Sequence, residues 1–253
     1  MRLLLALLLL LFLANASLRA EWRVGSAVLR PTGSPAITHW TKSVQQGRQR
    51  PVKIELILLD RSKTTLKVID LPAGGSVADG LRKAGALAGV NGGYFHRDRT
   101  PLGLVIIDGK TTHALERAKL LSGLVTVTPR GASLLRVAEY KNSRHIRQAL
   151  QAGPYLVDQG RAVTGLNSTR LAERTVLLAD KQGVVALLIT SSVSLADLGK
   201  LLATPALFPE LKIDRALNLD GGSSTALWID GEPTPFSHSE WKRVRNALAV
   251  MPK

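Results

Sequence analysis

The sequence predicts an α+β fold: a single sheet-rich domain of mixed or antiparallel strands with two or three helices. Three observations favour this fold. Short apolar or alternating runs dominate the chain, and turn residues separate them. Helical spacing of apolar residues is clear in only two segments. No linker rich in Gly, Pro or Ser and no long repeat divides the chain, so we expect one domain over residues 17–253, with its core at about 87–250.

The expected elements follow one another closely along the chain. Turn residues at 60–63, between the first two strand runs below, and at 180–183 predict two β-hairpins. Each expected helix begins at a serine that can cap it. The basic segment 21–49 is less regular, and we interpret it as a lead-in strand with a mobile loop. Strands are expected at 53–59, 64–69, 104–107, 124–127, 133–137, 175–179, 184–189, 216–219, 226–229 and 247–251, and helices at 76–87 and 194–202.

Residues 1–16 have the pattern of a secretory signal peptide. Arg2 precedes an unbroken apolar run over 3–13, and Ala14-Asn15-Ala16 supplies a small-residue cleavage site. Arg19 ends the apolar run short of the roughly twenty residues that a membrane span needs. We therefore expect export to a bacterial periplasm with no stable membrane span after cleavage, and an uncleaved anchor is the alternative.

Composition excludes several classes of site. Cysteine is absent, which excludes disulfide scaffolds, zinc ribbons and thiol nucleophiles. The five histidines lack metal-ligand spacing, so we expect no cofactor, although Asp220 and Asp230 leave a divalent cation open. A net charge of +15 permits an anionic partner. The basic residues are scattered and aromatic residues make up only 4%, so nucleic acid is not expected as the partner.

The first polar interruption of the strand pattern is Asn91-Gly92-Gly93-Tyr94-Phe95. A double glycine lets backbone N–H groups come close to a ligand. Asn91 can donate and accept hydrogen bonds, and Tyr94 or Phe95 can form a wall against a sugar face. A plain tight turn with two core aromatics is the alternative reading.

Two further interruptions lie in the middle of the chain. Gly153-Pro154 bends the chain within 151–160, for which we predict a structural role. Arg174 begins an apolar strand and shares a face with Val176 and Leu178, because side chains alternate along a strand. Its guanidinium fork suits a phosphate, and an exposed surface arginine is the alternative.

The fourth interruption is Asn218-Leu219-Asp220-Gly221-Gly222-Ser223-Ser224-Thr225. An apolar strand delivers the Asp220 carboxylate into a double-glycine turn, and Gly221 and Gly222 leave room for substrate. Ser223 and Ser224 offer hydrogen bonds. An Asp-Gly hairpin turn is the alternative, but Asp230-Gly231 is such a turn and lacks the hydroxyl run.

Taken in order, these segments resemble the phosphodiester glycosidase family, which includes a lysosomal enzyme that removes N-acetylglucosamine from a phosphodiester on mannose, and many exported bacterial members. The resemblance covers about residues 87–250. One departure is Ser223, where the family usually has a third glycine or a proline. The matching strings are NGGYF at 91–95, PLGLVIIDGK at 101–110, AGPYLVDQG at 152–160, RT at 174–175 and NLDGGSST at 218–225.

The resemblance implies an exported glycosidase that hydrolyses a sugar-1-phosphodiester, with Asn91, Arg174 and Asp220 lining the pocket. Asp220 would act as nucleophile or general base, Arg174 would hold the phosphate, and Asn91 would contact a sugar hydroxyl. No second carboxylate is assigned, so inverting and retaining chemistry stay open, with Asp180 and Glu173 as candidates. The expected substrate-binding residues are Gly92, Gly93, Tyr94, Gly221, Gly222, Ser223 and Ser224.

Two rival functions remain at this stage. A non-catalytic exported module that binds anionic envelope polymer would use the positive charge. A serine hydrolase would use Ser223, Asp230 and His238, which follow one another in a known triad order. Gly221 to Thr225 has a threonine where a nucleophile elbow needs glycine, and the spacing is too compressed for that fold.

Overall fold

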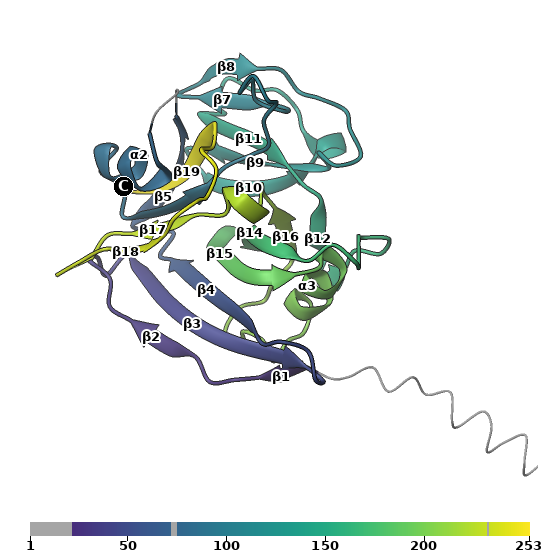
Figure 1. Ribbon diagram of the computed structural model, residues 1–253. Coiled ribbons are helices and arrows are strands. Elements are labelled where there is room, and N and C mark those ends of the chain that lie inside the picture. Colours follow the sequence, from purple (N-terminus) through teal and green to yellow (C-terminus); the bar gives the residue numbers. More distant parts are fainter. Residues whose placement is uncertain (1–21, 72–74, 232) are drawn as a thin grey trace, which may run out of the picture.

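The computed structural model describes residues 22–71, 75–231 and 233–253, whose strands form three antiparallel sheets (Figure 1). The largest sheet has the order β1-β3-β4-β15-β14-β16-β12-β13, with β2 paired to β3. Its strands are β1 (Trp22–Val24), β2 (Val28–Arg30), β3 (Ile37–Gln46), β4 (Val52–Leu59), β12 (Tyr155–Asp158), β13 (Arg161–Ala162), β14 (Ala172–Asp180), β15 (Gly183–Val193) and β16 (Arg215–Asn218).

The other two sheets have five strands each. The second has the order β10-β9-β11-β7-β8 and the third has the order β18-β17-β6-β19-β5. The strands of the second sheet are β7 (Val105–Ile107), β8 (Lys110–His113), β9 (Gly123–Thr128), β10 (Gly131–Arg136) and β11 (Gln148–Ala152). Those of the third are β5 (Thr64–Asp70), β6 (Ala88–Asn91), β17 (Leu227–Ile229), β18 (Phe236–His238) and β19 (Asn246–Pro252).

The main hydrophobic core contains buried side chains from all three sheets. Leu177 of the large sheet, Leu150 of the second and Leu248 of the third belong to one buried cluster. Strand alternation gives the large sheet a second apolar face, where Val176 and Leu178 contact a separate cluster. The α+β class predicted from the sequence is therefore confirmed.

Two α-helices and two short 3₁₀ turns complete the described chain. Helix α2 (Val77–Lys83) packs on the third sheet, and α3 (Leu195–Leu202) covers the second apolar face of the large sheet. Ser76 and Ser194 cap these helices as predicted, because each hydroxyl accepts a backbone N–H three residues later. The 3₁₀ turns are η1 (Val137–Glu139) and η2 (Gly222–Ser224).

Two local predictions are wrong. β4 and β5 do not form a hairpin: β4 pairs with β3 and β15, whereas β5 pairs with β19 in another sheet. The turn at 60–63 is present, but its strands diverge into different sheets, which place Ile57 of β4 and Leu66 of β5 in the same hydrophobic core. The segment 21–49 is also more regular than predicted, since β3 alone runs for ten residues. The second predicted hairpin, β14–β15, is confirmed.

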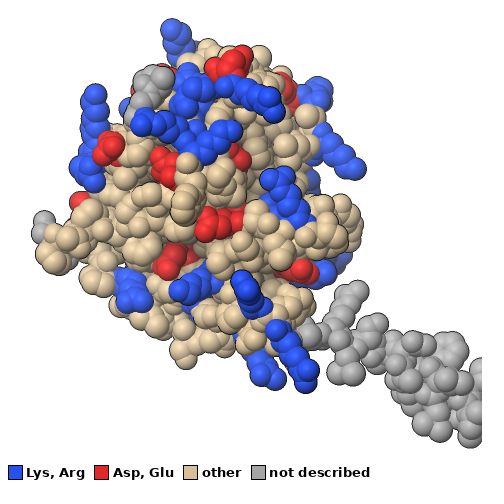
Figure 2. Space-filling view, in the orientation of Figure 1, with Lys and Arg blue, Asp and Glu red and all other residues tan. Residues whose placement is uncertain are grey.

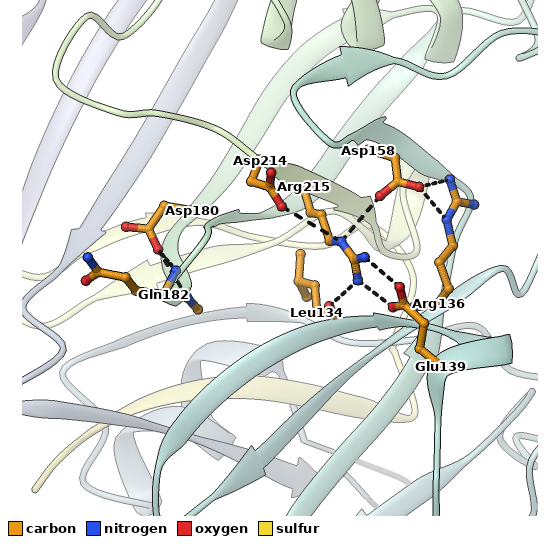
Figure 3. Close-up of polar contacts among 9 residues, drawn as sticks. Leu134, Arg136, Glu139, Asp158, Asp180, Gln182, Asp214 and Arg215 are labelled. Carbon is orange, nitrogen blue, oxygen red and sulfur yellow. Dashed lines mark hydrogen bonds and ion pairs between the residues drawn. The ribbon is translucent and has the colours of Figure 1, made fainter.

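A cluster of charged residues joins the second sheet to the large one (Figure 3). The Arg215 guanidinium contacts Glu139 at 2.5 and 2.7 Å and Asp158 at 3.3 Å. Arg136 binds the same Asp158 carboxylate at 2.7 and 2.9 Å. These contacts tie β10 and η1 to β12 and β16, and they give the 151–160 segment the structural role predicted for it.

The predicted signal peptide lies outside the described residues. Within the described chain, neither α-helix has the length and hydropathy needed to cross a bilayer.

Candidate active site

Polar groups from four distant segments meet where β6, β14 and β16 lie near one another. Val176 of β14 pairs with Asn218 of β16, which sets the start of one strand beside the end of the other. The turn after β16 is then fixed by backbone bonds, from Leu219 N to Thr175 O at 2.8 Å and from Asp220 N to Gly92 O at 3.1 Å. The segments that carry Asn91, Arg174 and Asp220 are therefore neighbours in space.

Asn91, at the end of β6, is fully buried and joins these segments through its side chain. Its Nδ2 donates to the backbone oxygen of Asp220 at 2.8 Å. Its Oδ1 accepts from Thr175 Oγ1 at 2.7 Å and from Ala226 N at 3.0 Å. The observed bonds give Asn91 a positioning role in the loop that carries Asp220, and the contact with a sugar hydroxyl stays a prediction.

Tyr94 links the first motif to the second. Its hydroxyl donates to the backbone oxygen of Gly153 at 2.7 Å and accepts from Asn218 Nδ2 at 3.0 Å. Burial and the nearby Asp220 carboxylate raise the pKa of this hydroxyl, so it stays protonated. The bend at Gly153-Pro154 therefore contributes a backbone oxygen to the site, which the sequence did not indicate.

Asp220 is a partly buried carboxyl that keeps several stabilising partners. Its Oδ1 accepts from Gly221 N at 2.8 Å, and its side chain is also hydrogen-bonded to Ser224. Burial raises the pKa of this carboxyl, while the bonds from Ser224 and Gly221 and the positive charges of Lys242 and Arg170 act in the opposite direction. Burial dominates, so Asp220 takes up a proton more readily than an exposed aspartate does.

Arg174 is a buried cation whose hydrogen bonds go to neutral oxygens. Only 7% of the residue is exposed, and the side chain donates to Val193 O at 3.0 Å and to Arg170 O at 2.8 Å. No carboxylate in the described chain forms an ion pair with it. Burial, together with the positive charge of Arg170, lowers its pKa, although the neighbouring Tyr94 counteracts this effect. A guanidinium has five N–H donors, so donors remain for an anion.

The glycines of the two loops mainly permit close contact between backbones. A Cβ on Gly92 would collide with Asn246, and one on Gly221 would lie 2.7 Å from the backbone oxygen of Glu173. A Cβ on Gly93 would lie 2.9 Å from Gln151 O. Gly222 has φ +62°, which glycine adopts without strain. Their contact with substrate stays a prediction.

Sequence reasoning missed several groups around this centre. Asn218 is buried, and its Oδ1 has almost no accessible surface and no hydrogen-bond partner among the described residues, so it is an unsatisfied acceptor inside this centre. Trp241 and Lys242 lie beside the Asp220 loop because the N–H groups of both donate to Ser223 O at 2.9 Å. The Trp241 side chain is 88% exposed. Its isolated position in a polar stretch, 239–243, was the available signal.

The two candidates for a second catalytic carboxylate lie at different distances from this centre. Asp180 is at the far end of β14, where it pairs with Arg61 at 2.6 Å. Six residues of strand separate it from Arg174, or about 20 Å. Asp180 is therefore remote from this centre. Glu173 is close to it and contacts His238 Nε2 at 3.2 Å.

The structure gives little support to a serine hydrolase triad or to a metal site in the described residues. His238 contacts Glu173, and Asp220 rather than a histidine is the partner of Ser224. Ser223 is exposed, and its backbone oxygen receives the two bonds from Trp241 and Lys242. Across the described residues, no group of three or more His, Asp or Glu side chains is arranged to hold a metal ion.

Comparisons with known proteins agree on one family and fold. A family model described as phosphodiester glycosidase matches residues 84–251. No curated protein matches the chain. Among solved structures, the catalytic domain of zebrafish N-acetylglucosamine-1-phosphodiester alpha-N-acetylglucosaminidase, auto-inhibited by its pro-peptide, is similar with a TM-score of 0.65 and 16% identity. That match covers 95% of this chain and 91% of the zebrafish chain.

A second similar structure is a hypothetical protein from Synechocystis, with a TM-score of 0.61 and 17% identity. It covers 90% of this chain and 64% of the Synechocystis chain. At these identities the structures establish a shared fold. The fold similarity includes the N-terminal strands, which the sequence motifs alone did not reach.

Proposed function

Because this chain belongs to the phosphodiester glycosidase family, we propose that it is an exported hydrolase that cleaves the glycosyl–phosphate bond of a sugar-1-phosphodiester. The observation that carries the proposal is a pair of hydrogen-bonded segments, one with the partly buried carboxyl of Asp220 and the other with the buried guanidinium of Arg174, which has no carboxylate partner in the described chain. Both groups are electrostatically coupled to the same Tyr94 hydroxyl.

Arg174 supports the phosphate end of this reaction. Burial of an unpaired cation is costly, and an anionic ligand relieves that cost. A phosphodiester carries one negative charge and two non-bridging oxygens, which match the guanidinium fork. Arg170, whose backbone oxygen accepts from Arg174, adds positive charge nearby.

Asp220 supports the reaction at the sugar carbon. The bond between that carbon and the phosphate oxygen breaks, and the phosphate leaves with its electron pair, so it needs little help from an acid. Water supplies the new hydroxyl, and its proton goes to Asp220 if the carboxylate acts as a general base. If Asp220 is the nucleophile, it first forms a glycosyl ester that water then hydrolyses.

The groups around Asp220 fit the sugar itself. Trp241 presents an exposed indole beside the Asp220 loop, and the apolar face of a pyranose packs well on such a ring. The protonated Tyr94 hydroxyl holds Gly153 and Asn218 in place.

The test is to incubate the mature protein with a panel of sugar-1-phosphodiesters and to identify the products. We expect free reducing sugar and a phosphate monoester. Asp220→Asn is expected to reduce turnover by at least a thousandfold. Asp230→Asn, in the exposed Asp-Gly turn, is the matched control and is expected to keep full activity. Release of sugar phosphate, or full activity of Asp220→Asn, would contradict the proposal.

The Asp220→Asn variant also needs a stability control. An aspartate whose pKa is raised in the folded state reduces stability as pH rises from its unfolded pKa through its folded pKa. Removal of the charge is therefore expected to leave the free energy of unfolding at pH 7 equal or higher. Urea denaturation of both proteins measures this difference, which separates loss of chemistry from loss of fold.

Binding of anionic envelope polymer is the second candidate function, and the net charge of +15 favours it. On the face that Figure 2 shows, Lys and Arg side chains lie at several separate places, with Asp and Glu between them. Such a surface is suited to weak, salt-dependent attraction of a polymer, and it lacks a continuous basic groove along which a polymer would bind. Polymer binding that falls steeply with salt, together with no hydrolysis of any panel member, would favour this function.

Export to the periplasm is part of the same proposal. It rests on the signal-peptide pattern of residues 1–16. Cell fractionation combined with N-terminal sequencing of the mature protein tests both the location and the cleavage near Ala16.

A further inference from the structure

A cavity of about 390 Å³ lies between the large sheet and the loop that leads into β18. Strands β2, β3 and β4 contribute side chains to one wall, and residues of the segment 231–236 form the other. No residue of the Asp220 centre lines this cavity, and β15 separates β4 from β14, which carries Arg174. The volume falls within the range of about 300–1,000 Å³ that is typical of small-molecule sites.

Glu55 supplies a carboxylate to this cavity, and one of its oxygens is held by two protein groups. Glu55 of β4 lies directly opposite Thr41 of β3, and His39 is the next residue on the same face of β3. Thr41 Oγ1 donates to Glu55 Oε2 at 2.8 Å, and His39 Nε2 contacts the same oxygen at 2.8 Å. No donor among the described residues bonds to Glu55 Oε1. The carboxylate is therefore fixed in orientation, with one oxygen left for a ligand.

Arg30 supplies a positive charge on the other side of the Thr41 hydroxyl. Its Nε donates to Thr41 Oγ1 at 3.3 Å, so this one hydroxyl contacts both the guanidinium and the Glu55 carboxylate. Within the described chain, Glu55 forms its ion pair with His39, and Arg30 has no carboxylate within ion-pair distance. Two opposite charges therefore line one cavity without neutralising each other in direct contact.

Phe236 of β18 forms the apolar part of the cavity wall. Its ring packs edge-on against the His39 ring, with the ring centroids 4.8 Å apart. Pro31 and Pro235 add rigid apolar surface. The segment before β18 is tied to the chain after β2 by the bond from Gly33 N to Asp230 O at 2.8 Å. An aromatic ring beside a carboxylate suits an ammonium group, and the prolines suit an apolar side chain.

We propose that this cavity binds a zwitterion, namely a free α-amino acid with an apolar side chain. The ammonium group contacts Glu55 Oε1, the carboxylate contacts the Arg30 guanidinium, and the side chain packs on Phe236. An α-amino acid carries its two charges close together, which matches two protein charges that share the Thr41 hydroxyl. A neutral ligand would leave both protein charges without a charged partner. This site is separate from the proposed hydrolysis and does not depend on it.

The test is calorimetric titration of the mature protein with leucine and with two analogues that each lack one charge. Isopentylamine lacks the carboxylate of leucine, and isocaproate lacks its ammonium group. We expect a dissociation constant for leucine below about 1 mM and at least tenfold weaker binding of each analogue, because each loses one charge-assisted contact. Glucose, which has hydroxyl groups and no charge, is expected not to bind in this cavity.

Two variants assign the binding to this cavity. Arg30→Met and Glu55→Gln each remove one charge and keep a side chain of similar length, and each is expected to weaken leucine binding at least tenfold. Arg23→Met, at an exposed position of β1, and Glu210→Gln, at an exposed position, are the matched controls and should bind leucine as wild type does. Asp220→Asn should also bind leucine as wild type does.

Three results would overturn the inference: no binding of leucine up to about 10 mM, equal binding of leucine and an analogue or glucose, or unchanged binding in Arg30→Met. If Glu55→Gln fails to fold, as judged by thermal unfolding, Arg30→Met decides alone, because Arg30 is exposed. Leucine binding that Asp220→Asn abolishes and Arg30→Met keeps would assign the ligand to the other centre. Calorimetry requires no turnover, so absence of phosphodiester hydrolysis would contradict only the proposed function.

Discussion

Residues in this site serve either chemistry or position, and hydrogen bonds distinguish the two. Asn91 is fully buried and uses its side chain to join three parts of the chain. The side chain of Asp220, by contrast, has its hydrogen bonds within its own loop, to Gly221 and Ser224. A carboxylate that is held locally and does not brace the fold can be replaced without loss of the fold.

If Asp220 acts as proposed, we expect Ser224 to influence the acid limb of the pH profile. Its bond to Asp220 stabilises the ionised carboxylate and lowers the pKa that burial raises. In Ser224→Ala the pKa of Asp220 rises further, so the acid limb of kcat/KM moves to higher pH. A pH–rate profile measures the shift, and Ser223→Ala, at the exposed neighbouring serine, should leave the limb in place. A limb that moves to lower pH in Ser224→Ala would contradict the role of Asp220.

Asn91→Ala tests the positioning role. The variant leaves the hydroxyl of Thr175, the N–H of Ala226 and the backbone oxygen of Asp220 without their observed partner. We expect a loss of about 3 kcal/mol in the free energy of unfolding, measured by urea denaturation, because buried polar groups lose their hydrogen bonds. Asn142→Ala, at an exposed position, should change stability by less than about 0.5 kcal/mol. Unchanged stability of Asn91→Ala would show that water replaces the amide.

At the scale of elements, the site depends on how closely β6 approaches β19. Gly92 follows β6, and its N–H donates to Asn246 O at 2.9 Å, while Asn246 Oδ1 accepts from Gly93 N. A side chain at Gly92 would occupy the space of the Asn246 amide. The double glycine of the first motif therefore serves the packing of two strands, in addition to any contact with ligand.

Gly92→Ala is expected to destabilise the protein by about 1–3 kcal/mol, because the new methyl group overpacks the β6–β19 junction. Activity should fall with it, since Gly92 O accepts from Asp220 N. Gly75→Ala is the control, because a Cβ there would meet no atom within 4 Å. Thermal unfolding and turnover are measured on both variants. Equal stability of the two would show that the junction relaxes easily.

At the scale of the whole molecule, charged clusters help to hold the sheets together. Arg215 lies between η1 and β12 and contacts carboxylates from both (Figure 3). The bond from Arg215 lowers the pKa of Glu139. A carboxylate with a lowered folded pKa adds stability above its unfolded pKa, near 4.5 here, and this stability is lost as pH falls through the folded pKa.

Arg215→Ala is expected to cost about 2 kcal/mol at pH 7, because carboxylates in a partly buried cluster lose their cation. The difference from wild type should shrink as pH falls below 4.5 toward 3, where Glu139 becomes protonated. Arg61→Ala breaks the single ion pair of a more exposed arginine with Asp180 and should cost less than about 1 kcal/mol. Denaturation curves at both pH values measure these differences, and a constant difference would assign the effect to packing on Tyr155.

The sequence by itself determined the class of the fold, most strand and helix positions, the capping serines and the motifs of the family. These features depend on local spacing and on residue type, which are visible without a structure. Tertiary structure alone decided that β4 and β5 belong to different sheets, because the strands with which they pair, β15 and β19, come from distant parts of the chain.

The features of the candidate site divide in the same way between those visible in the sequence and those that only the tertiary structure shows. Asn91, Tyr94, Arg174 and Asp220 stood out in the sequence because polar residues there interrupt apolar runs. The orientations of these side chains could not be predicted from the sequence. Hydrogen-bond partners more than a hundred residues away determine where the Asn91 amide and the Tyr94 hydroxyl point. The burial of Arg174, and its lack of an ion-pair partner within the described chain, likewise exist only after distant strands have packed.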